Sequence, residues 1–235
     1  MTRILFALLG IAALAAPAAA AERSYSVTDF DRIQVEGPYI VRLTTGRSAA
    51  ARASGTIPAL DRVMIDVQSQ TLRIRRNRSY SGGTPGAQEG PLTISVSTRA
   101  LRSARLIGPG SLELDRVQGL RADLTVEGSG RLHAAAVAAD TLNLGLLGAG
   151  RLELAGTAGT LRADIQGSGD LDAAGLTAQN ATITTTTSGT VALAVVRAAT
   201  VTALGLGTVT IGGRPACTVT GAGATQVSCG RSNQR

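Results

Sequence analysis

The amino-acid sequence predicts an all-β fold, a single-stranded β-helix or β-solenoid whose coils are each about 16–20 residues long. Three observations predict it: a G-x-G motif recurs at this period, apolar residues stand at fixed offsets from each motif, and the composition is unusual. The chain has 29 Gly, no Trp and 2% aromatic residues, yet 44% of its residues are hydrophobic. A core without large aromatic side chains favours narrow layers of Leu, Val, Ile and Ala.

The G-x-G motif marks the corner of each predicted coil. Its first glycine stands at positions 108, 128, 148, 167, 205 and 221, and Thr187 takes the same place once. The steps between these positions, in chain order, are 20, 20, 19, 20, 18 and 16 residues. A repeat of this length is typical of a solenoid, in which each unit buries its apolar side against its neighbours.

Residues on either side of the motif alternate in polarity. Counted from the first glycine, positions −4, −2, +4 and +6 are apolar in nearly every repeat, whereas positions +3 and +5 are mostly polar. The +4 column is Leu112, Leu132, Leu152, Leu171, Val191, Val209 and Thr225. A period of two predicts strands with one buried face. We therefore expect each coil to contain a strand, the G-x-G corner, a second strand and a second turn, such as residues 155–159.

A glycine-rich phosphate-binding loop is the alternative interpretation of these motifs. Such loops lie between a strand and a helix. Here an alternating, strand-like segment follows every motif. We therefore expect the glycines to allow positive φ and a close approach between coils. No nucleotide or other cofactor site is predicted.

The segment before the regular repeats shows the same alternation in looser form. Ile33 and Val35 precede Gly37 at the −4 and −2 offsets, and Val41 and Leu43 follow it at +4 and +6. Two further alternating segments are expected to turn their apolar residues inward, namely Leu72, Ile74, Leu92, Ile94 and Val96. The stretch at 79–91 has no apolar period and is predicted to be the longest loop.

The first 21 residues have the form of a secretory signal peptide. Arg3 supplies a positive n-region, an apolar stretch follows at residues 4–16, and small residues lead to Ala21. We predict cleavage after Ala21 and export to the periplasm, the cell surface or the medium. No transmembrane segment is expected in the mature chain. The expected organisation is one solenoid domain at 22–235, with irregular coils at 22–107 and regular repeats at 108–230.

The chain has two cysteines, Cys217 and Cys229. In an exported protein, a nearby pair predicts a disulfide. Cys217 falls in the apolar −4 column, and Cys229 keeps the inward parity of Val227. A bond between them would pin the last coil and would be worth roughly 2–3 kcal/mol. The one histidine, His133, is far from both cysteines in sequence, so no zinc site is predicted.

All 23 basic residues are arginines, and the formal net charge is +7. The densest group, with a tyrosine beside it, is the candidate ligand surface: Arg73, Arg75, Arg76, Arg78 and Tyr80. Such a surface could meet anionic glycans or lipid headgroups. A solvated basic face without a ligand is the alternative. Nucleic acid is not an expected partner, because the chain is predicted to be exported and no aromatic residues alternate with the arginines for base stacking.

Polysaccharide-cleaving β-helices are the main enzymatic alternative, and they need carboxylates gathered in pairs or around a metal. Glu113, Glu153 and Asp172 share one outward column, interrupted by His133. We expect Asp170 and Asp172 to lack acidic partners in neighbouring coils. Their expected partners are arginines of the same face, Arg131 and Arg151. No catalytic residue is therefore predicted.

Two other binding chemistries are weighed and set aside. A calcium-binding repeat needs its Asp in successive turns, and GSGDLDA supplies it in one turn only. No metal site is predicted. Outward threonine pairs of the kind that bind ice occur at Thr182 and Thr184, Thr200 and Thr202, and Thr208 and Thr210. Arg162 and Asp164 break this array in the preceding coil, and threonine is also an ordinary exposed strand residue.

One run of the sequence, FDRIQVEGPYIVRLTTG and its continuation to TLRIRRN, resembles the head GIN domain of bacterial auto-transporter adhesins. The matching residues are Phe30, Ile33, Val35, Gly37, Pro38, Val41, Gly46, Leu60, Val63, Thr71, Leu72 and Ile74. The resemblance covers nearly all of the mature chain. It implies a single, right-handed β-helical solenoid exported to the envelope, and it implies no known catalytic residues. Arg47 departs from the pattern, in which an acidic residue usually follows the glycine.

Together, these observations predict a non-enzymatic exported protein of the cell envelope or surface. It would be an adhesin-like scaffold that presents flat faces to a glycan or protein of the envelope. A polysaccharide-active β-helix enzyme and a purely structural envelope protein are the alternatives. Because the ends of a solenoid expose strand edges, end-to-end self-association is also open to the chain.

Overall fold

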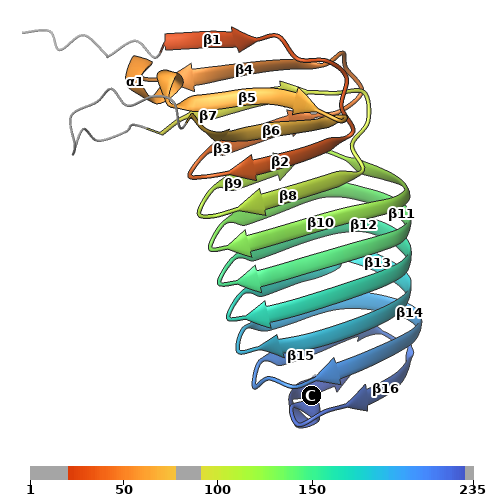
Figure 1. The fold of residues 1–235 in the computed structure, drawn as a ribbon. Coiled ribbons are helices and arrows are strands. Elements are labelled where there is room, and N and C mark those ends of the chain that lie inside the picture. The colour runs from red at the N-terminus through yellow and green to blue at the C-terminus, as the bar shows by residue number, and fades with distance from the viewer. Residues whose placement is uncertain (1–20, 78–90, 231–235) are drawn as a thin grey trace, which may run out of the picture.

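The computed structural model describes residues 21–77 and 91–230 and shows a β-solenoid of stacked parallel strands, as predicted (Figure 1). The predicted signal sequence up to residue 20 and nearly all of the predicted loop at 79–91 lie outside the described residues. The chain starts at one end of the stack and finishes at the other, so that the core is a column of apolar side chains running along the solenoid axis.

The body of the solenoid consists of strands that pair in parallel from one coil to the next. These strands are β8 (Ser103–Ile107), β9 (Ser111–Leu114), β10 (Val117–Gly128), β11 (Arg131–Gly148), β12 (Arg151–Gly167), β13 (Asp170–Thr187), β14 (Thr190–Ala203) and β15 (Thr208–Gly213). Leu132 stacks on Leu152, which stacks on Leu171, and all three side chains are buried. The predicted +4 column is therefore confirmed over these coils.

The second turn predicted at residues 155–159 is a bend within strand β12, where Gly156 has φ +127° and a Cβ on it would clash with the carbonyl oxygen of Val137 in the neighbouring coil. Strand pairing continues through this bend, with a register shift between Glu153 and Ala155. A β-bulge bends a strand without ending its pairing. At the G-x-G corner, by contrast, the strands are interrupted, as between Gly148 and Arg151. Gly148 has φ +113° there, and a Cβ on it would lie 2.6 Å from the carbonyl oxygen of Gly128 in the neighbouring coil.

The N-terminal coils are stacked in an order that differs from their order in the chain. The coil of β2 (Arg32–Glu36) and β3 (Ile40–Thr44) lies between the coil of β6 (Thr71–Arg76) and β7 (Thr93–Ser97) and the coil of β8 and β9. Val41 thus lies between Ile94 and Leu112. The offsets predicted from Gly37 are confirmed. The coil stacked next to the coil of β2 and β3, that of β8 and β9, begins about seventy residues later in the chain.

The N-terminal end of the solenoid is closed by antiparallel strands and a short helix. Strand β1 (Ala21–Tyr25) pairs with β4 (Ala50–Gly55), β4 pairs with β7, and β5 (Val63–Gln68) pairs with β6. Helix α1 (Ile57–Asp61) begins where the Thr56 hydroxyl accepts the N–H of Ala59 at 3.3 Å. It buries Ala59 and Leu60 against the end of the core (Figure 1).

The last coil contains β16 (Ala216–Thr220), a 3-10 helix η1 (Ala224–Gln226) and β17 (Val227–Cys229). Its predicted alignment is wrong by two residues. Val219 stacks on Val201 and Val227 on Val209, so the last coil has 18 residues, since 227 − 209 = 18, and not 16. Thr225 lies in η1 and not in the apolar column, because Gly223 and not Gly221 occupies the corner above Gly205.

The predicted disulfide joins Cys217 and Cys229, whose Cα atoms lie 6.6 Å apart. Cys217 stacks on Ala199 and not in the −4 column. As expected for the last coil, no described coil covers Cys217, and its side chain is exposed. Cys229 stacks on Ile211 in the +6 column and is partly buried.

Candidate functional site

The predicted arginine surface lies on strand β6, on the outward side of the N-terminal coils. Arg73 and Arg75 point outward as predicted, and Arg76 is exposed at the end of the strand. Arg78 and Tyr80, the other two members of the predicted surface, lie outside the described residues. The structure therefore places three of the five predicted residues together on one strand.

Acidic and polar side chains accompany these arginines. Arg73 Nη1 donates to Gln68 Oε1 at 2.7 Å, and Arg75 Nη2 lies 3.5 Å from Asp66 Oδ1. On the same side of the molecule, Arg102 Nε donates to Asp31 Oδ2 at 2.6 Å and Arg105 Nη2 to Glu127 Oε1 at 2.5 Å. The opposite charges of such surface ion pairs largely offset each other. The arginine group is thus part of a mixed-charge surface.

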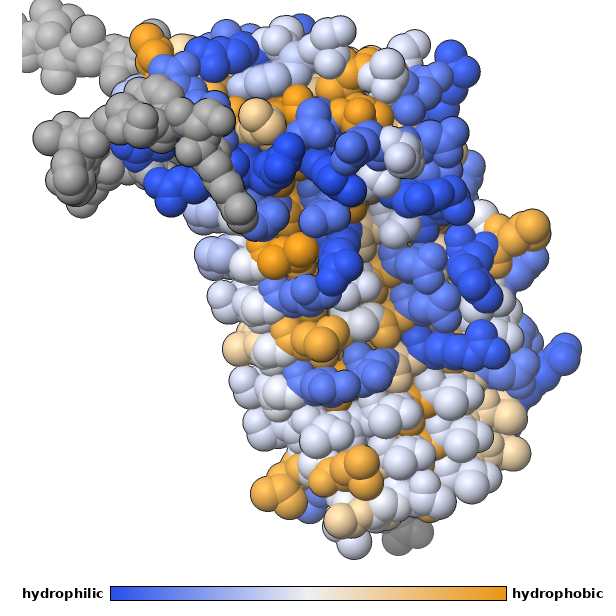
Figure 2. All heavy atoms as spheres, in the orientation of Figure 1, coloured by the Kyte–Doolittle hydropathy of each residue, from blue (hydrophilic) through white to orange (hydrophobic). Residues whose placement is uncertain are grey.

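This side of the solenoid changes along its length from strongly hydrophilic near the N-terminal coils to paler, nearly neutral colours near the last coils (Figure 2), as arginines give way to threonines. We call it the arginine–threonine face; it is the outward side of β6, β2, β8, the second halves of β10 to β14, and β16. Its last three coils carry two rows of three threonines. The rows are Thr182, Thr200 and Thr218, and Thr184, Thr202 and Thr220. As predicted, Arg162 and Asp164 end the array in the preceding coil. Thr218 and Thr220 were missed because of the two-residue error in the last coil.

A second, longer face runs without interruption from the first strand to the last. We call it the long face; one of its rows is Ser24, Arg52, Ser95, Arg42, Glu113, His133, Glu153, Asp172, Ala192, Thr210 and Ser228. Neighbouring residues of such a row are about 4.8 Å apart. Outward side chains from segments separated by up to two hundred residues therefore form one regular array.

Ion pairs connect neighbouring coils on the long face. Arg151 Nη2 lies 3.2 Å from Asp170 Oδ2, as expected for this arginine. Asp170 Oδ1 also accepts the hydroxyl of Thr190 at 2.7 Å and its backbone N–H at 2.9 Å. These two hydrogen bonds, followed by Arg151, lower the pKa of Asp170 below its ordinary value. The ion pair of Arg42 Nε with Glu113 Oε2, at 2.9 Å, has the same form.

The expectation that Asp172 lacks an acidic neighbour is wrong. Glu153 stands directly beside it in the adjacent coil. Glu153 also has basic neighbours, since His133 Nδ1 lies 3.6 Å from Oε2 and Arg151 Nη1 lies 3.8 Å from Oε1. Asp172 Oδ1 accepts the backbone N–H of Ala174 at 3.3 Å. Within the described residues, no group of three or more His, Cys, Asp or Glu side chains is placed to hold a metal ion.

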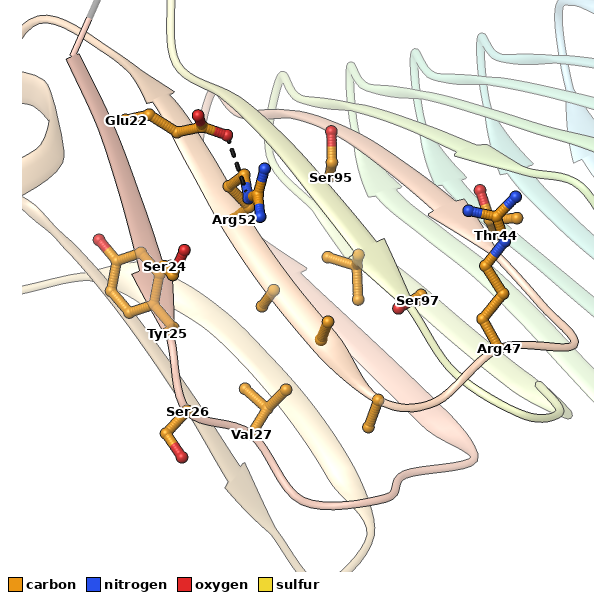
Figure 3. Close-up of a pocket in the computed structure, with 14 residues that line it drawn as sticks. Glu22, Ser24, Tyr25, Ser26, Val27, Thr44, Arg47, Arg52, Ser95 and Ser97 are labelled. Atoms are coloured by element: carbon orange, nitrogen blue, oxygen red, sulfur yellow. Dashed lines mark ion pairs between the residues drawn. The ribbon is translucent and has the colours of Figure 1, made fainter.

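A groove of about 610 Å³ opens at the N-terminal end of the long face (Figure 3). It runs over strands β1, β4 and β7 and is bounded by the segment that follows β3. Three small residues, Ala49, Ala50 and Ala51, are part of its lining, and the side chain of Ala51 is buried in the core. Its rim carries the hydroxyl groups of Ser24, Ser26, Thr44, Ser95 and Ser97.

Two arginines and one glutamate supply the charge of this groove. Arg52 Nε lies 3.1 Å from Glu22 Oε1, across the pair of strands β1 and β4 (Figure 3). Arg47 lies at the other end of the groove, near Thr44 (Figure 3). Arg47 is exposed and forms no ion pair with any residue that the structure describes. The groove is therefore the best candidate for a binding site on this molecule.

Sequence reasoning missed the groove because three distant segments form it. Residues 22–27, 44–52 and 95–97 meet only because β4 pairs antiparallel with both β1 and β7. The signal that could have pointed to it is the alternation of serines, at Ser24 and Ser26 and at Ser95 and Ser97, on the outward side of two strands.

The sequence matches the family described as "Putative auto-transporter adhesin, head GIN domain" over residues 29–215. This stretch contains most of the solenoid, including β2 to β15 and two of the three segments that line the groove. A comparison with functionally curated proteins gives no match.

Several solved structures have a similar fold. One is a "putative adhesin" from Bacteroides fragilis NCTC 9343, with TM-score 0.77, 17% identity, and coverage of 91% of this chain and 96% of that chain. A "putative adhesin" from Parabacteroides distasonis ATCC 8503 has TM-score 0.68 and 18% identity, with 90% and 95% covered. A "putative lipid binding protein" from the same organism has TM-score 0.66 and 18% identity, with 91% and 96% covered. At these identities the likeness shows the fold alone.

Proposed function

The chain belongs to the family of auto-transporter adhesin head GIN domains, and from this membership we propose that it is an exported, non-enzymatic surface protein that binds a glycan or protein of the cell envelope. The observation that carries the proposal is the long face. Its outward side chains stand in register from coil to coil, on strands that, between the two ends of the stack, are hydrogen-bonded to neighbours on both sides. A rigid array loses little conformational entropy when it binds an extended partner.

The proposal includes export through the predicted signal peptide. Expression of the full chain in a bacterial host should give a protein of the envelope fraction whose first residue is Glu22, as measured by mass spectrometry of the intact protein. Strand β1 begins at Ala21, so cleavage at this point leaves the strand nearly whole. Recovery of the uncut chain from the cytoplasm would contradict export. Within residues 21–77 and 91–230, no helix has the length and apolarity needed to cross a membrane.

Binding is tested with the purified mature chain, residues 22–235, and washed envelope fragments. Co-sedimentation should retain the folded protein on the fragments in a saturable manner. The same protein, unfolded in urea and diluted, is the control for nonspecific adsorption. Failure of the folded protein to sediment with envelope fragments from several bacteria would favour the purely structural alternative.

A polysaccharide-active enzyme remains a second candidate because Glu153 and Asp172 stand side by side. Two adjacent carboxylates are the minimum that glycoside hydrolysis needs. We expect no release of reducing ends by the parent protein or by a Glu153→Gln, Asp172→Asn variant, over a panel of envelope and extracellular polysaccharides. Activity present in the parent and absent from the variant would establish the enzyme and overturn the non-enzymatic proposal.

A further inference from the structure

The groove at the N-terminal end of the long face offers unsatisfied hydroxyl groups. Ser24, Ser26 and Ser95 are exposed, and their side chains form no hydrogen bond with any described residue. Ser97 differs, because its hydroxyl donates to the carbonyl oxygen of Ser48 at 2.7 Å and keeps its lone pairs for a ligand. Hydroxyl groups both donate and accept, so a row of them suits a ligand that is itself rich in hydroxyls.

The groove also has an excess of positive charge. Arg52 uses its Nε on Glu22, but the Arg52 side chain is 62% exposed, and a guanidinium has four further N–H donors. Arg47 has all five donors free of ion pairs within the described part of the chain. Two guanidinium groups at separate ends of one groove favour a ligand with anionic groups at intervals along its length. Arginine binds carboxylate and sulfate groups through paired hydrogen bonds.

The residues that line the groove disfavour a lipid acyl chain and favour a polar polymer. The apolar residues of the lining other than alanine are Val27, Val96 and Tyr25. Val96 is buried, and the Tyr25 hydroxyl is directed to the carbonyl oxygen of Leu60 at 3.5 Å. Little apolar surface is therefore left for a lipid tail, whereas the small alanine side chains leave room for a saccharide chain to lie across the strands.

We propose that this groove binds an acidic saccharide, a sugar chain that carries carboxylate or sulfate groups. Arg47 and Arg52 would bind its acidic groups, and the serine hydroxyls between them would bind its sugar hydroxyls. This assignment rests on the proposed adhesin function and names the chemical class of the ligand for one site on the long face.

The test is calorimetric titration of the mature chain with four saccharides of matched length. They are a carboxylated oligogalacturonide, its fully methyl-esterified form, a sulfated heparin-derived oligosaccharide and its desulfated, N-acetylated and carboxyl-reduced form. At least one acid should bind, and its neutral counterpart should bind more weakly by roughly tenfold or more, because each charge-assisted hydrogen bond to an arginine contributes about that factor. Equal binding of both acids and their neutral counterparts, or no binding of either acid, would overturn the proposal.

Arg47→Gln, Arg52→Gln is the variant that tests the site, and Arg162→Gln, Arg197→Gln is its matched control. Arg162 and Arg197 are exposed on β12 and β14, far from the groove along the stack, and their replacement likewise removes two positive charges from the molecule. The double variant should lose roughly tenfold or more in affinity for the acidic saccharide, and the control should stay within about twofold. Unchanged thermal unfolding of all three proteins is expected because these side chains are exposed. Equal weakening in the control would show that net charge alone attracts the saccharide, which overturns the site.

Co-sedimentation of the same variants with envelope fragments separates this inference from the adhesin proposal. If the parent and the double variant sediment equally, the groove assignment fails while the adhesin function stands. If the parent does not sediment, the adhesin function fails, whatever the titrations give. If protease treatment of the fragments abolishes sedimentation of both proteins, the partner is a protein and the saccharide assignment is overturned.

Discussion

At the scale of single residues, two threonines replace apolar or glycine residues inside the solenoid. Thr187 takes the corner position, where its Oγ1 accepts the N–H of Gly189 at 3.0 Å and donates to the carbonyl oxygen of Gly169 at 3.4 Å. Thr185 lies two residues earlier in an apolar column, and its buried Oγ1 has no hydrogen-bond partner among the described residues. The same residue type thus has opposite energetic consequences at neighbouring positions.

Replacement of Thr185 by valine should stabilise the fold. The valine has the same shape and removes a buried hydroxyl whose lost hydration costs about 1–3 kcal/mol. Urea unfolding followed by circular dichroism should show a higher midpoint. Thr187→Val is the matched control and should lower the midpoint, because it leaves the Gly189 N–H without its acceptor. A lower midpoint for Thr185→Val would mean that its hydroxyl is in fact satisfied.

Asp170 should make the unfolding free energy depend on pH. Its pKa is lowered in the folded state by Thr190 and Arg151. The charged form is therefore favoured by folding, so the stabilisation is fully present above the ordinary pKa of an aspartate. It is lost as the pH falls below about 4 and through the lowered pKa. Asp170→Asn should be less stable than the parent at neutral pH, and the difference should shrink in acid. A constant difference across this window would contradict the assignment.

At the scale of elements, the last coil differs from the coils of the body because, among the described residues, it has a neighbour on one side only. Strand β16 pairs with β14, and β17 pairs with β15 through three residue pairs. Cys217 and Val219 are exposed or half-buried, although the residues on which they stack are fully buried. The Cys217–Cys229 disulfide is the covalent link that joins the two strands of this coil.

Removal of this disulfide should loosen the last coil and leave the others intact. Cys217→Ser, Cys229→Ser should lose roughly 2–3 kcal/mol of stability in this coil, because a short closed loop becomes free in the unfolded state. Hydrogen exchange should show faster exchange in β16 and β17 and unchanged protection in β11 and β12. Faster exchange along the whole solenoid would show instead that the disulfide supports a single cooperative unit.

At the scale of the whole molecule, the stack has a closed N-terminal end. Helix α1 and the antiparallel strands β1, β4 and β5 occupy this end. Solenoids need such a cap because an uncovered coil presents both its core and its strand edges. This cap also forms the groove, so that the element which protects the solenoid provides the candidate binding site.

Deletion of residues 22–98 should cause self-association. The deletion removes β2 and β3, on which β8 and β9 are stacked. One edge of β8 and one edge of β9 then have no strand to pair with. Sedimentation velocity should show a single small species for the mature chain and large assemblies for residues 99–235. A monomeric fragment with cooperative unfolding would contradict the capping role of the N-terminal coils.

Much of the body was predictable because alternation is a local property of a strand. Leu132, Leu152 and Leu171 were placed in one column from their offsets, and the structure stacks them. The same offsets failed at Thr225, because the last coil repeats the 18-residue step of the coil before it and its corner is Gly223, not Gly221. A spacing rule cannot choose between two possible corners when glycines stand at both positions.

The candidate surfaces were predictable only where one strand carries them. Arg73 and Arg75 were placed outward correctly from their parity on β6. Their acidic neighbours, such as Asp66, come from another strand, and so does the carboxylate of Glu153 beside Asp172. Neighbours of this kind depend on the pairing between strands.

The sequence by itself determined the repeat, the inward and outward sides of each strand and the disulfide partners, because each follows from residue types at short and regular spacing. The tertiary structure alone decided the order of the N-terminal coils, the alignment of the last one and the position of the groove. Those features depend on which strand edges pair, and every strand of period two offers the same hydrogen-bonding groups to many partners. The choice among those partners is made by the packing of the whole molecule.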